Sequence, residues 1–237
     1  MTRSRSASSR SAGNALAASG WASVRTPARH PGWPARLGPV RVTGGVVELR
    51  KPRLRDGAAW SRVRMRDQHY LEMWEPSAPG TWAERNSNVA WLSQWSALRS
   101  LARRGQSLPF VITLDGAFAG QITIGNIIRG SLCSAWVGYW VAADLAGAGV
   151  ATAAVALVVD HCFAVSGLHR LEATVRPENA ASLRVLAKLG FRHEGLFKRY
   201  LDVAGDWRDH HCLAITAEEA SGGMVAKLRA DGRAGFG

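Results

Sequence analysis

Acidic residues are missing from the first part of this chain, since none occurs before Glu48. The same stretch holds seven arginines, which carry more than half of the formal net charge of +12. Setting those seven charges aside leaves +5 for all the remaining residues, so the rest of the chain is only mildly basic. The composition therefore does not indicate a domain with a basic surface throughout, as many nucleic-acid-binding proteins have.

Residues 1–40 are rich in Ser, Arg, Ala, Gly and Pro and lack a periodic apolar pattern, which predicts a disordered tail. Three interpretations of this tail stay open: a nucleic-acid- or ribosome-binding arm, a transit-type presequence, and translation from a misassigned upstream start. Lysine is scarce in the whole chain, with four residues among the 30 basic ones, which is typical of a GC-rich genome and favours the misassigned start. A nucleic-acid partner is expected, if at all, only through this tail.

Long apolar runs and clustered cysteines are also lacking. No stretch reaches the ~20 apolar residues that a membrane-spanning helix needs, and no secretory apolar segment is present. Cys133, Cys162 and Cys212 are widely separated, so we expect small core residues in a reducing cytoplasm rather than disulfides. His210, His211 and Cys212 must alternate between the faces of a strand and cannot converge on a metal. We expect a cytoplasmic protein without a metal and without membrane association.

Periodic apolar patterns begin at residue 46. Helical spacing occurs at 56–65, 81–104, 153–163 and 180–189, whereas residues 70–79 are typical of a loop. The order is one strand, two helices, a run of strands, then strand–helix–strand–helix elements and a hairpin, which indicates an α/β (α+β) protein. The strand-like runs are 46–50, 108–114, 118–128, 132–141, 170–175, 191–201 and 207–215.

A glycine-rich turn, Asp144 to Thr152, lies between a strand-like and a helix-like run. Such a turn directs several backbone N–H groups outward at the positive end of the helix, which suits a phosphate or diphosphate. No lysine follows the glycines, so the nucleoside-triphosphate-binding loop is excluded. The nicotinamide-dinucleotide fold is disfavoured as well, because Thr152 replaces its third small residue and an antiparallel meander precedes the turn.

The segment 169–195, read HRLEATVRPENAASLRVLAKLGFRHEG, continues the pattern after the turn. Together with Trp74-Glu75-Pro76 and residues 199–210, it resembles the GCN5-related N-acetyltransferase (GNAT) family in its ribosomal-protein acetyltransferase (RimJ/RimL) form. In the family's diphosphate loop, Arg/Gln-x-x-Gly-x-Gly/Ala, Gly149 and Ala151 match, and Ala146 departs from the leading residue. The resemblance covers 46–217 and implies a single GNAT domain with a mixed, mainly antiparallel twisted sheet flanked by helices. Residues 218–237 would form a C-terminal tail.

Acetyl-CoA is the cosubstrate that this resemblance implies. In the family, the strand before the loop diverges from its neighbour, and its free backbone groups bind the pantetheine arm. That strand would be Gly138 to Val141, with a backbone N–H near Val141 as the oxyanion donor; simple core packing is the alternative for its side chains. The residues expected to contact coenzyme A are Tyr139, Trp140, Val141, Ala146, Gly147, Ala148, Gly149, Val150, Ala151, Thr152, Asn179 and Ser182.

Asn179 and Ser182 stand at the start of a short helix, where the residues alone predict a cap and a first-turn position. Many relatives carry a tyrosine in this helix that protonates the leaving thiolate, but Leu186 occupies the corresponding place here. In RimJ/RimL-type relatives a serine has this role, which the resemblance assigns to Ser182. Water is the alternative, because a thiolate leaves with little acid help.

A general base is harder to place, because Trp136 and Val137 stand where the family usually carries a glutamate. Glu75 and Asp209 are the candidates, either as bases through water or as anchors for a cationic amine, and each could instead be a structural ion-pair partner. An α-amine has a pKa of about 7.7–8.0 against about 10.4 for lysine, so it needs little desolvation to react. An N-terminal α-amine is therefore favoured as the acceptor, and a dedicated base can be unnecessary.

The resemblance implies acetylation of a protein N-terminus, with a ribosomal protein as the first candidate partner, by a monomer or homodimer. Two alternatives stay open. The acceptor could be a small amine such as an aminoglycoside, a polyamine or an amino acid. The chain could also be a ribosome- or RNA-binding acyl-CoA module with weak or no catalysis, which the Arg-rich tail and the missing tyrosine and glutamate would favour.

Overall fold

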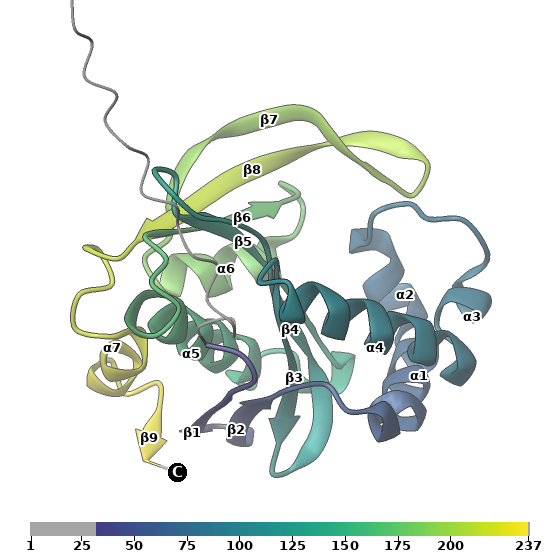
Figure 1. Cartoon of the computed structure of the whole chain (residues 1–237), viewed down its shortest axis with the longest axis horizontal. Helices are drawn as coiled ribbons and strands as arrows, with labels where there is room; N and C mark the ends of the chain where they lie inside the picture. Colours follow the sequence, from purple (N-terminus) through teal and green to yellow (C-terminus); the bar gives the residue numbers. More distant parts are fainter. Residues whose placement is uncertain (1–31, 237) are drawn as a thin grey trace, which may run out of the picture.

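The computed structural model describes residues 32–236, which form a twisted nine-stranded sheet with helices on both sides (Figure 1). The strand order is β7-β8-β6-β5-β4-β3-β2-β1-β9, and only the β5–β6 pair is parallel. The expected mixed, mainly antiparallel sheet is therefore confirmed. The strands are β1 (Arg36–Val42), β2 (Gly45–Arg50), β3 (Leu108–Leu114), β4 (Ala117–Ile128), β5 (Ser134–Val141), β6 (Arg170–Val175), β7 (Arg192–Val203), β8 (Asp206–Thr216) and β9 (Gly235–Phe236).

Helix α5 is the central helix of the molecule. Its sequence is apolar over most of its circumference, and eleven of its fifteen residues are buried, with contacts to β1, β2, β4, β5 and α7. Figure 1 shows α5, α6 and α7 on one side of the sheet and α1 to α4 on the other. The helices are α1 (Gly57–Arg66), α2 (Gln68–Leu71), α3 (Trp82–Arg85), α4 (Asn88–Arg103), α5 (Val150–Ala164), α6 (Ala180–Lys188) and α7 (Met224–Ala230).

The single helix expected over 81–104 is two helices. Ser87 breaks it, because its hydroxyl accepts the backbone N–H of Ala90 and caps a new helix. Thr81 caps the preceding short helix in the same way, with Glu84 completing the capping box. Residues 70–79 also differ from the expected loop, since α2 and a 3-10 turn at Glu72–Trp74 occupy the first half.

The domain is longer than the 46–217 that the sequence indicates. Strand β1 begins within the expected tail 1–40 and pairs with β2 and β9, which buries Val40. At the other end, the expected C-terminal tail 218–237 contains α7, whose Met224 and Leu228 are buried in the core. Asp160 on α5 accepts the first backbone N–H groups of α7 and fixes its start. The rest of the prediction for the N-terminal tail concerns residues 1–31, which lie outside the described residues.

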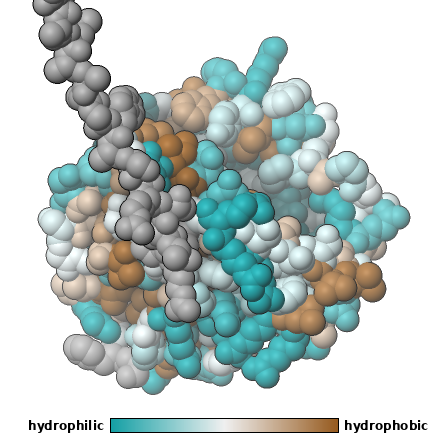
Figure 2. All heavy atoms as spheres, viewed as in Figure 1, coloured by the Kyte–Doolittle hydropathy of each residue, from teal (hydrophilic) through white to brown (hydrophobic). Residues whose placement is uncertain are grey.

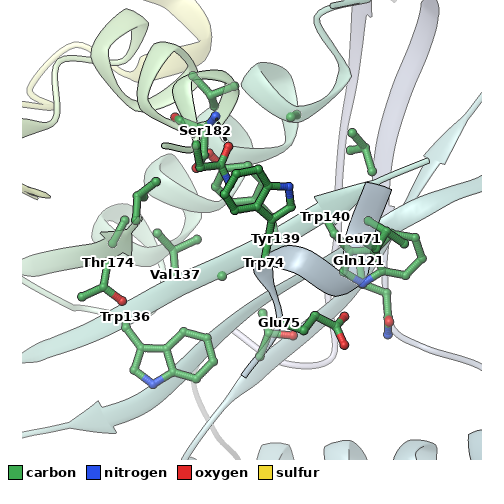
Figure 3. A pocket seen from close by; sticks show the side chains of 18 of the residues that line it. Leu71, Trp74, Glu75, Gln121, Trp136, Val137, Tyr139, Trp140, Thr174 and Ser182 are labelled. Atoms are coloured by element: carbon green, nitrogen blue, oxygen red, sulfur yellow. Dashed lines mark hydrogen bonds between the residues drawn. The ribbon is translucent and has the colours of Figure 1, made fainter. Parts of the chain in front are cut away.

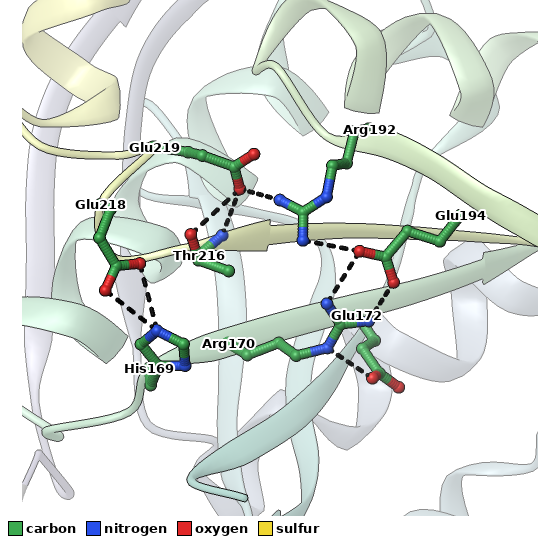
Figure 4. Close-up of polar contacts among 8 residues, drawn as sticks. All are labelled: His169, Arg170, Glu172, Arg192, Glu194, Thr216, Glu218 and Glu219. Carbon is green, nitrogen blue, oxygen red and sulfur yellow. Dashed lines mark hydrogen bonds and ion pairs between the residues drawn. The ribbon is translucent and has the colours of Figure 1, made fainter.

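A charged network ties β7 to β6 across the intervening strand β8 (Figure 4). Arg170 on β6 binds Glu194 on β7, and Arg192 links Glu194 to Glu219. Between them, β8 presents the small side chain of Ala214, opposite both Glu172 and Arg192, which leaves room for the long side chains to meet. The base of the β7–β8 hairpin is thereby fixed, while its other end extends towards α2 and α3.

Among residues 32–236, no helix combines the length and the apolar character that crossing a membrane requires.

Candidate active site

Strands β5 and β6 separate halfway along their length. Their parallel pairing runs only from Ser134 to Trp136, whereas β5 stays paired with β4 as far as Val141. The backbone of residues 137–141 is thus free on the side that faces β6. The N–H of Ala142 bonds the carbonyl of Ala119 on β4, and successive N–H groups of a strand point in opposite directions, so the N–H of Val141 points into the opening.

The glycine-rich turn lies beside this opening and leads into α5. Gly147 and Gly149 have φ of +82° and +85°, which explains glycine at both positions. A short 3-10 turn at Ala143–Leu145 precedes them, and the first N–H groups of α5 follow without helical partners. These N–H groups have the arrangement that the sequence predicts for an anion-binding helix end, and the binding itself stays a prediction.

Helix α1 holds the entry to this turn. The carboxylate of Asp67 accepts the backbone N–H of Ala143 at 2.8 Å, and Arg66 binds both Asp67 and Asp144. The hydrogen bond from Arg66 is the main reason why the pKa of the buried Asp67 is lowered, with the Ala143 N–H adding to it. The roles of Arg66 and Asp67 were not expected from the sequence, because nothing local marks the contact between Asp67 and Ala143, which are 76 residues apart.

A cavity of about 1470 Å³ has two ends, one at the glycine-rich turn and one on the α1–α4 side. We call these the loop end (145–152 and 179–182) and the tryptophan end (Trp60, Arg64, Trp74, Glu75 and Trp140). In Figure 2 the surface is hollowed between the hairpin and these helices. All the residues expected at the site line the cavity except Ala148 and Asp209.

Ser182 and Tyr139 meet at the loop end (Figure 3). The phenol oxygen of Tyr139 lies 2.9 Å from Oγ of Ser182, and burial raises the pKa of Tyr139 to about 12. Asn179 caps α6 by accepting the N–H of Ser182, as its position in the sequence predicts. Leu186 is fully buried and offers no polar atom to the cavity. The contact of the tyrosine hydroxyl was missed, because the sequence separation of 43 residues leaves no local signal.

Glu75 faces the tryptophan end, where Arg64 binds it. The guanidinium of Arg64 is buried, also donates to Asn86, and lies 5.5, 4.7 and 5.2 Å from the rings of Trp60, Trp82 and Trp140. Figure 3 shows the Glu75 carboxylate and Ser182 as parts of one cavity. Glu75 is therefore both an ion-pair partner and a carboxylate that lines the site.

Asp209 lies outside the cavity, on the β7–β8 hairpin. Its carboxylate binds Nζ of Lys198 at 2.7 Å and the N–H of Arg199 at 2.9 Å. The hydrogen bond from Lys198 is the main cause that lowers the pKa of Asp209. Arg199 has φ of +48°, so Asp209 stabilises an irregular point of strand β7. The structure does not bring this candidate together with Glu75 and Ser182.

The Trp74–Ser77 segment is fastened to the far end of the hairpin. The N–H of Ser77 donates to the carbonyl of Asp202 at 2.8 Å, and its hydroxyl accepts the N–H of Gly205 at 2.9 Å. Pro76 also forms a β-bridge with Val203. This junction closes the cavity on the side of Glu75.

Trp136 is one of the two residues expected in the neighbourhood of the family's usual glutamate. Its ring lies across Gly125 and Gly138, where a Cβ would come within 2.2 and 3.0 Å of it. The side chain is 44% exposed and lines the cavity, so it supplies an apolar surface and no base. Within the described part of the chain, no group of three or more His, Cys, Asp or Glu side chains is arranged to hold a metal ion.

Known proteins resemble this chain in sequence and in structure. The family described as "Acetyltransferase (GNAT) domain" matches residues 47–192. The chain is similar to the structure of Mycobacterium smegmatis RimJ in complex with CoA-disulfide, with a TM-score of 0.87, 57% identity and coverage of 88% of this chain and 100% of that one.

Two sequence relatives extend the comparison. The [ribosomal protein uS5]-alanine N-acetyltransferase of Escherichia coli is 26% identical, over 79% of this chain and 96% of its own. The probable N-acetyltransferase YjcK of Bacillus subtilis is 44% identical over 101 residues, which is 43% of this chain, and the match spans 56% of its length. By the match of its domain and a structural similarity that covers most of its length, the chain belongs to the GNAT acetyltransferase family.

Proposed function

We propose that the protein transfers the acetyl group of acetyl-CoA to the N-terminal α-amine of a protein, and that this acceptor is a ribosomal protein. The observation that carries the proposal is the continuous cavity between the glycine-rich turn and Glu75. Two relatives support it: RimJ, whose structure contains a CoA-disulfide, and the uS5-alanine N-acetyltransferase, which aligns over almost its whole length.

Acetyl-CoA fits the loop end of the cavity. The N–H groups at the start of α5 would bind the diphosphate, and the free backbone of 137–141 would bind the pantetheine arm. Basic side chains line the cavity as well, among them Arg176, Arg184 and Lys188, which suits an anionic cosubstrate. The remaining expected contacts to coenzyme A are part of this proposal.

The acetyl transfer would take place between the two ends of the cavity. The neutral amine attacks the thioester carbon, and the N–H of Val141 stabilises the oxyanion, an interaction that contributes about 3 kcal/mol in such sites. Ser182 donates its hydroxyl hydrogen to the departing sulfur. Glu75 would bind the acceptor's ammonium group and receive its proton through water, while Arg64 holds the carboxylate in place.

The small-amine alternative receives less support from the cavity. Polycationic acceptors call for an excess of acidic side chains, whereas the three carboxylates that line this cavity are each paired with an arginine. These carboxylates are Glu75, Glu172 and Glu178. A single α-ammonium group needs only one of them. A protein N-terminus is therefore the better acceptor.

The test is acetyl-CoA consumption by the full chain with peptides that differ only in their amines. Peptides with free N-terminal Ala, Ser or Met would be compared with an N-blocked peptide containing lysine and with an aminoglycoside. We expect turnover of the free N-terminus and none of the same peptide after N-acetylation. Selective turnover of the aminoglycoside or of lysine would refute the proposed acceptor.

A further inference from the structure

The hydroxyl groups of Tyr139 and Ser182 form a pair across the opening between β5 and α6 (Figure 3). Tyr139 is on the strand whose free backbone faces the cavity, and Ser182 is in the first turn of α6. Both residues line the cavity. The pair is therefore placed where the thioester of acetyl-CoA would lie under the proposed function.

The chemistry of the two hydroxyls decides which one donates. Burial raises the pKa of Tyr139 to about 12, so the phenol keeps its proton throughout the physiological range. A phenol is a better donor and a poorer acceptor than an aliphatic hydroxyl, which favours donation from Tyr139 to Oγ of Ser182. In the described part of the chain, Oγ of Ser182 has no other protein partner, so its own hydrogen is available to the cavity.

We propose that Tyr139 is a positioning residue: its phenol donates to Oγ of Ser182 and thereby directs the serine hydrogen towards the sulfur of coenzyme A. This inference rests on acetyl-CoA as the acetyl donor. When the C–S bond of the tetrahedral adduct breaks, its electron pair stays on sulfur, which takes the Ser182 proton. The serine recovers a proton from the water that received one from the amine. Amine and thioester thus give amide and thiol, with Tyr139 and Ser182 unchanged.

Turnover of single and double variants tests the coupling. Tyr139→Phe removes only the hydroxyl, and Ser182→Ala removes the group through which it acts. We expect each single variant to lower kcat by about tenfold, which is below the usual contribution of a general acid because a thiolate leaves with little help. The double variant should be no slower than Ser182→Ala, because residues that act as a unit are not additive. KM for acetyl-CoA should stay within about twofold, since these changes act on a departing group.

Thr113→Val is the matched control, because it removes a buried hydroxyl whose partner is a β2 carbonyl outside the cavity. Its kcat should equal that of the wild type. Full activity of Tyr139→Phe would overturn the proposal. An equal loss from Tyr139→Phe in the presence and in the absence of Ser182 would also overturn it, because the phenol would then act independently.

A second measurement needs no acceptor. The thiol of bound coenzyme A can be titrated through the ultraviolet absorbance of its thiolate. A hydrogen bond from Ser182 stabilises the thiolate, so the pKa of the bound thiol should be lower in the wild type than in either single variant. Equal thiol pKa values in the wild type and Tyr139→Phe would refute the pair. If the pKa shift is present but peptides are not acetylated, only the proposed acceptor is wrong.

Discussion

Arg64 and Glu75 form an ion pair in which the arginine is enclosed by three tryptophan rings and the carboxylate lines the cavity. The side chain of Arg64 is 6% exposed and that of Glu75 is 29% exposed, so the pair presents its negative partner to the site. A buried arginine that donates to this carboxylate holds it in one orientation. Under the proposed function, this arrangement would give the acceptor's ammonium group a fixed partner.

Glu75→Gln should weaken acceptor use while leaving coenzyme A binding unchanged. The glutamine can still accept from Arg64, so the fold is kept and only the charge is lost. Loss of a charge-assisted hydrogen bond, about 1.5–3 kcal/mol, corresponds to a decrease in kcat/KM for the peptide of tenfold or more. Glu84→Gln is the control, because Glu84 caps α3 outside the cavity. Unchanged kcat/KM in Glu75→Gln would exclude the role of Glu75.

Asp209→Asn should have little effect on turnover. The carboxylate is on the hairpin, binds Lys198 and the N–H of Arg199, and does not line the cavity. Exposed ion pairs of this kind stabilise proteins by about 0–1 kcal/mol. We therefore expect kcat/KM within about twofold of the wild type and a small decrease in Tm. A loss of activity comparable with that of Glu75→Gln would show that Asp209 takes part in the reaction.

Glu194 should make the stability of the hairpin depend on pH. Hydrogen bonding to Arg170 is the main cause that lowers the pKa of Glu194 from 4.5 to about 2. A carboxyl group whose pKa is lower in the folded state stabilises it above the unfolded pKa, and this contribution is lost as the pH falls from 4.5 to about 2. The free energy of unfolding, measured by thermal denaturation, should be lower in Glu194→Gln than in the wild type by about 1 kcal/mol at neutral pH. The unfolding free energies of the two proteins should become equal near pH 2. A difference that stays constant with pH would contradict the ion-pair explanation.

The sequence predicts the elements of this fold better than the contacts between them. Short apolar runs between turn residues give β3, β4, β6 and β8 nearly to the residue, because each is a local signal: β6 alternates between its two faces, and β3 is buried on both. The break at Ser87 was missed, since a cap within a helical pattern competes with the apolar periodicity on both sides. Strand β1 was missed because its short pattern is interrupted by glycine and proline.

In the site too, local features are predicted from the sequence and contacts between distant residues are not. The glycine-rich turn and the cap at Asn179 are local signals, and the structure places both on the cavity. The contacts of Ser182 with Tyr139 and of Asp67 with Ala143 join residues 43 and 76 positions apart, which only the folded sheet brings together. Resemblance to a family names the residues of a site, but it does not reveal the partners that orient them.

The contact between Asp67 and Ala143 yields the last prediction. Asp67→Asn should weaken coenzyme A binding, because the amide keeps a weaker acceptor for the Ala143 N–H and loses the charge that holds Arg66. The glycine-rich turn would then have to be ordered by the ligand itself, and part of the binding free energy is spent on that ordering. We expect the Kd measured by calorimetry to rise by about tenfold, or ~1.4 kcal/mol.

Asp56→Asn separates this effect from general destabilisation. Asp56 is also buried, also binds an arginine, Arg50, and also accepts a backbone N–H, but at the other end of α1. Both variants should lower Tm to a similar extent, since each weakens an ion pair at the end of α1. Only Asp67→Asn should change the Kd. If Asp56→Asn weakens coenzyme A binding equally, the stability of α1 rather than the anchoring of the turn controls the site, and the role of Asp67 is refuted.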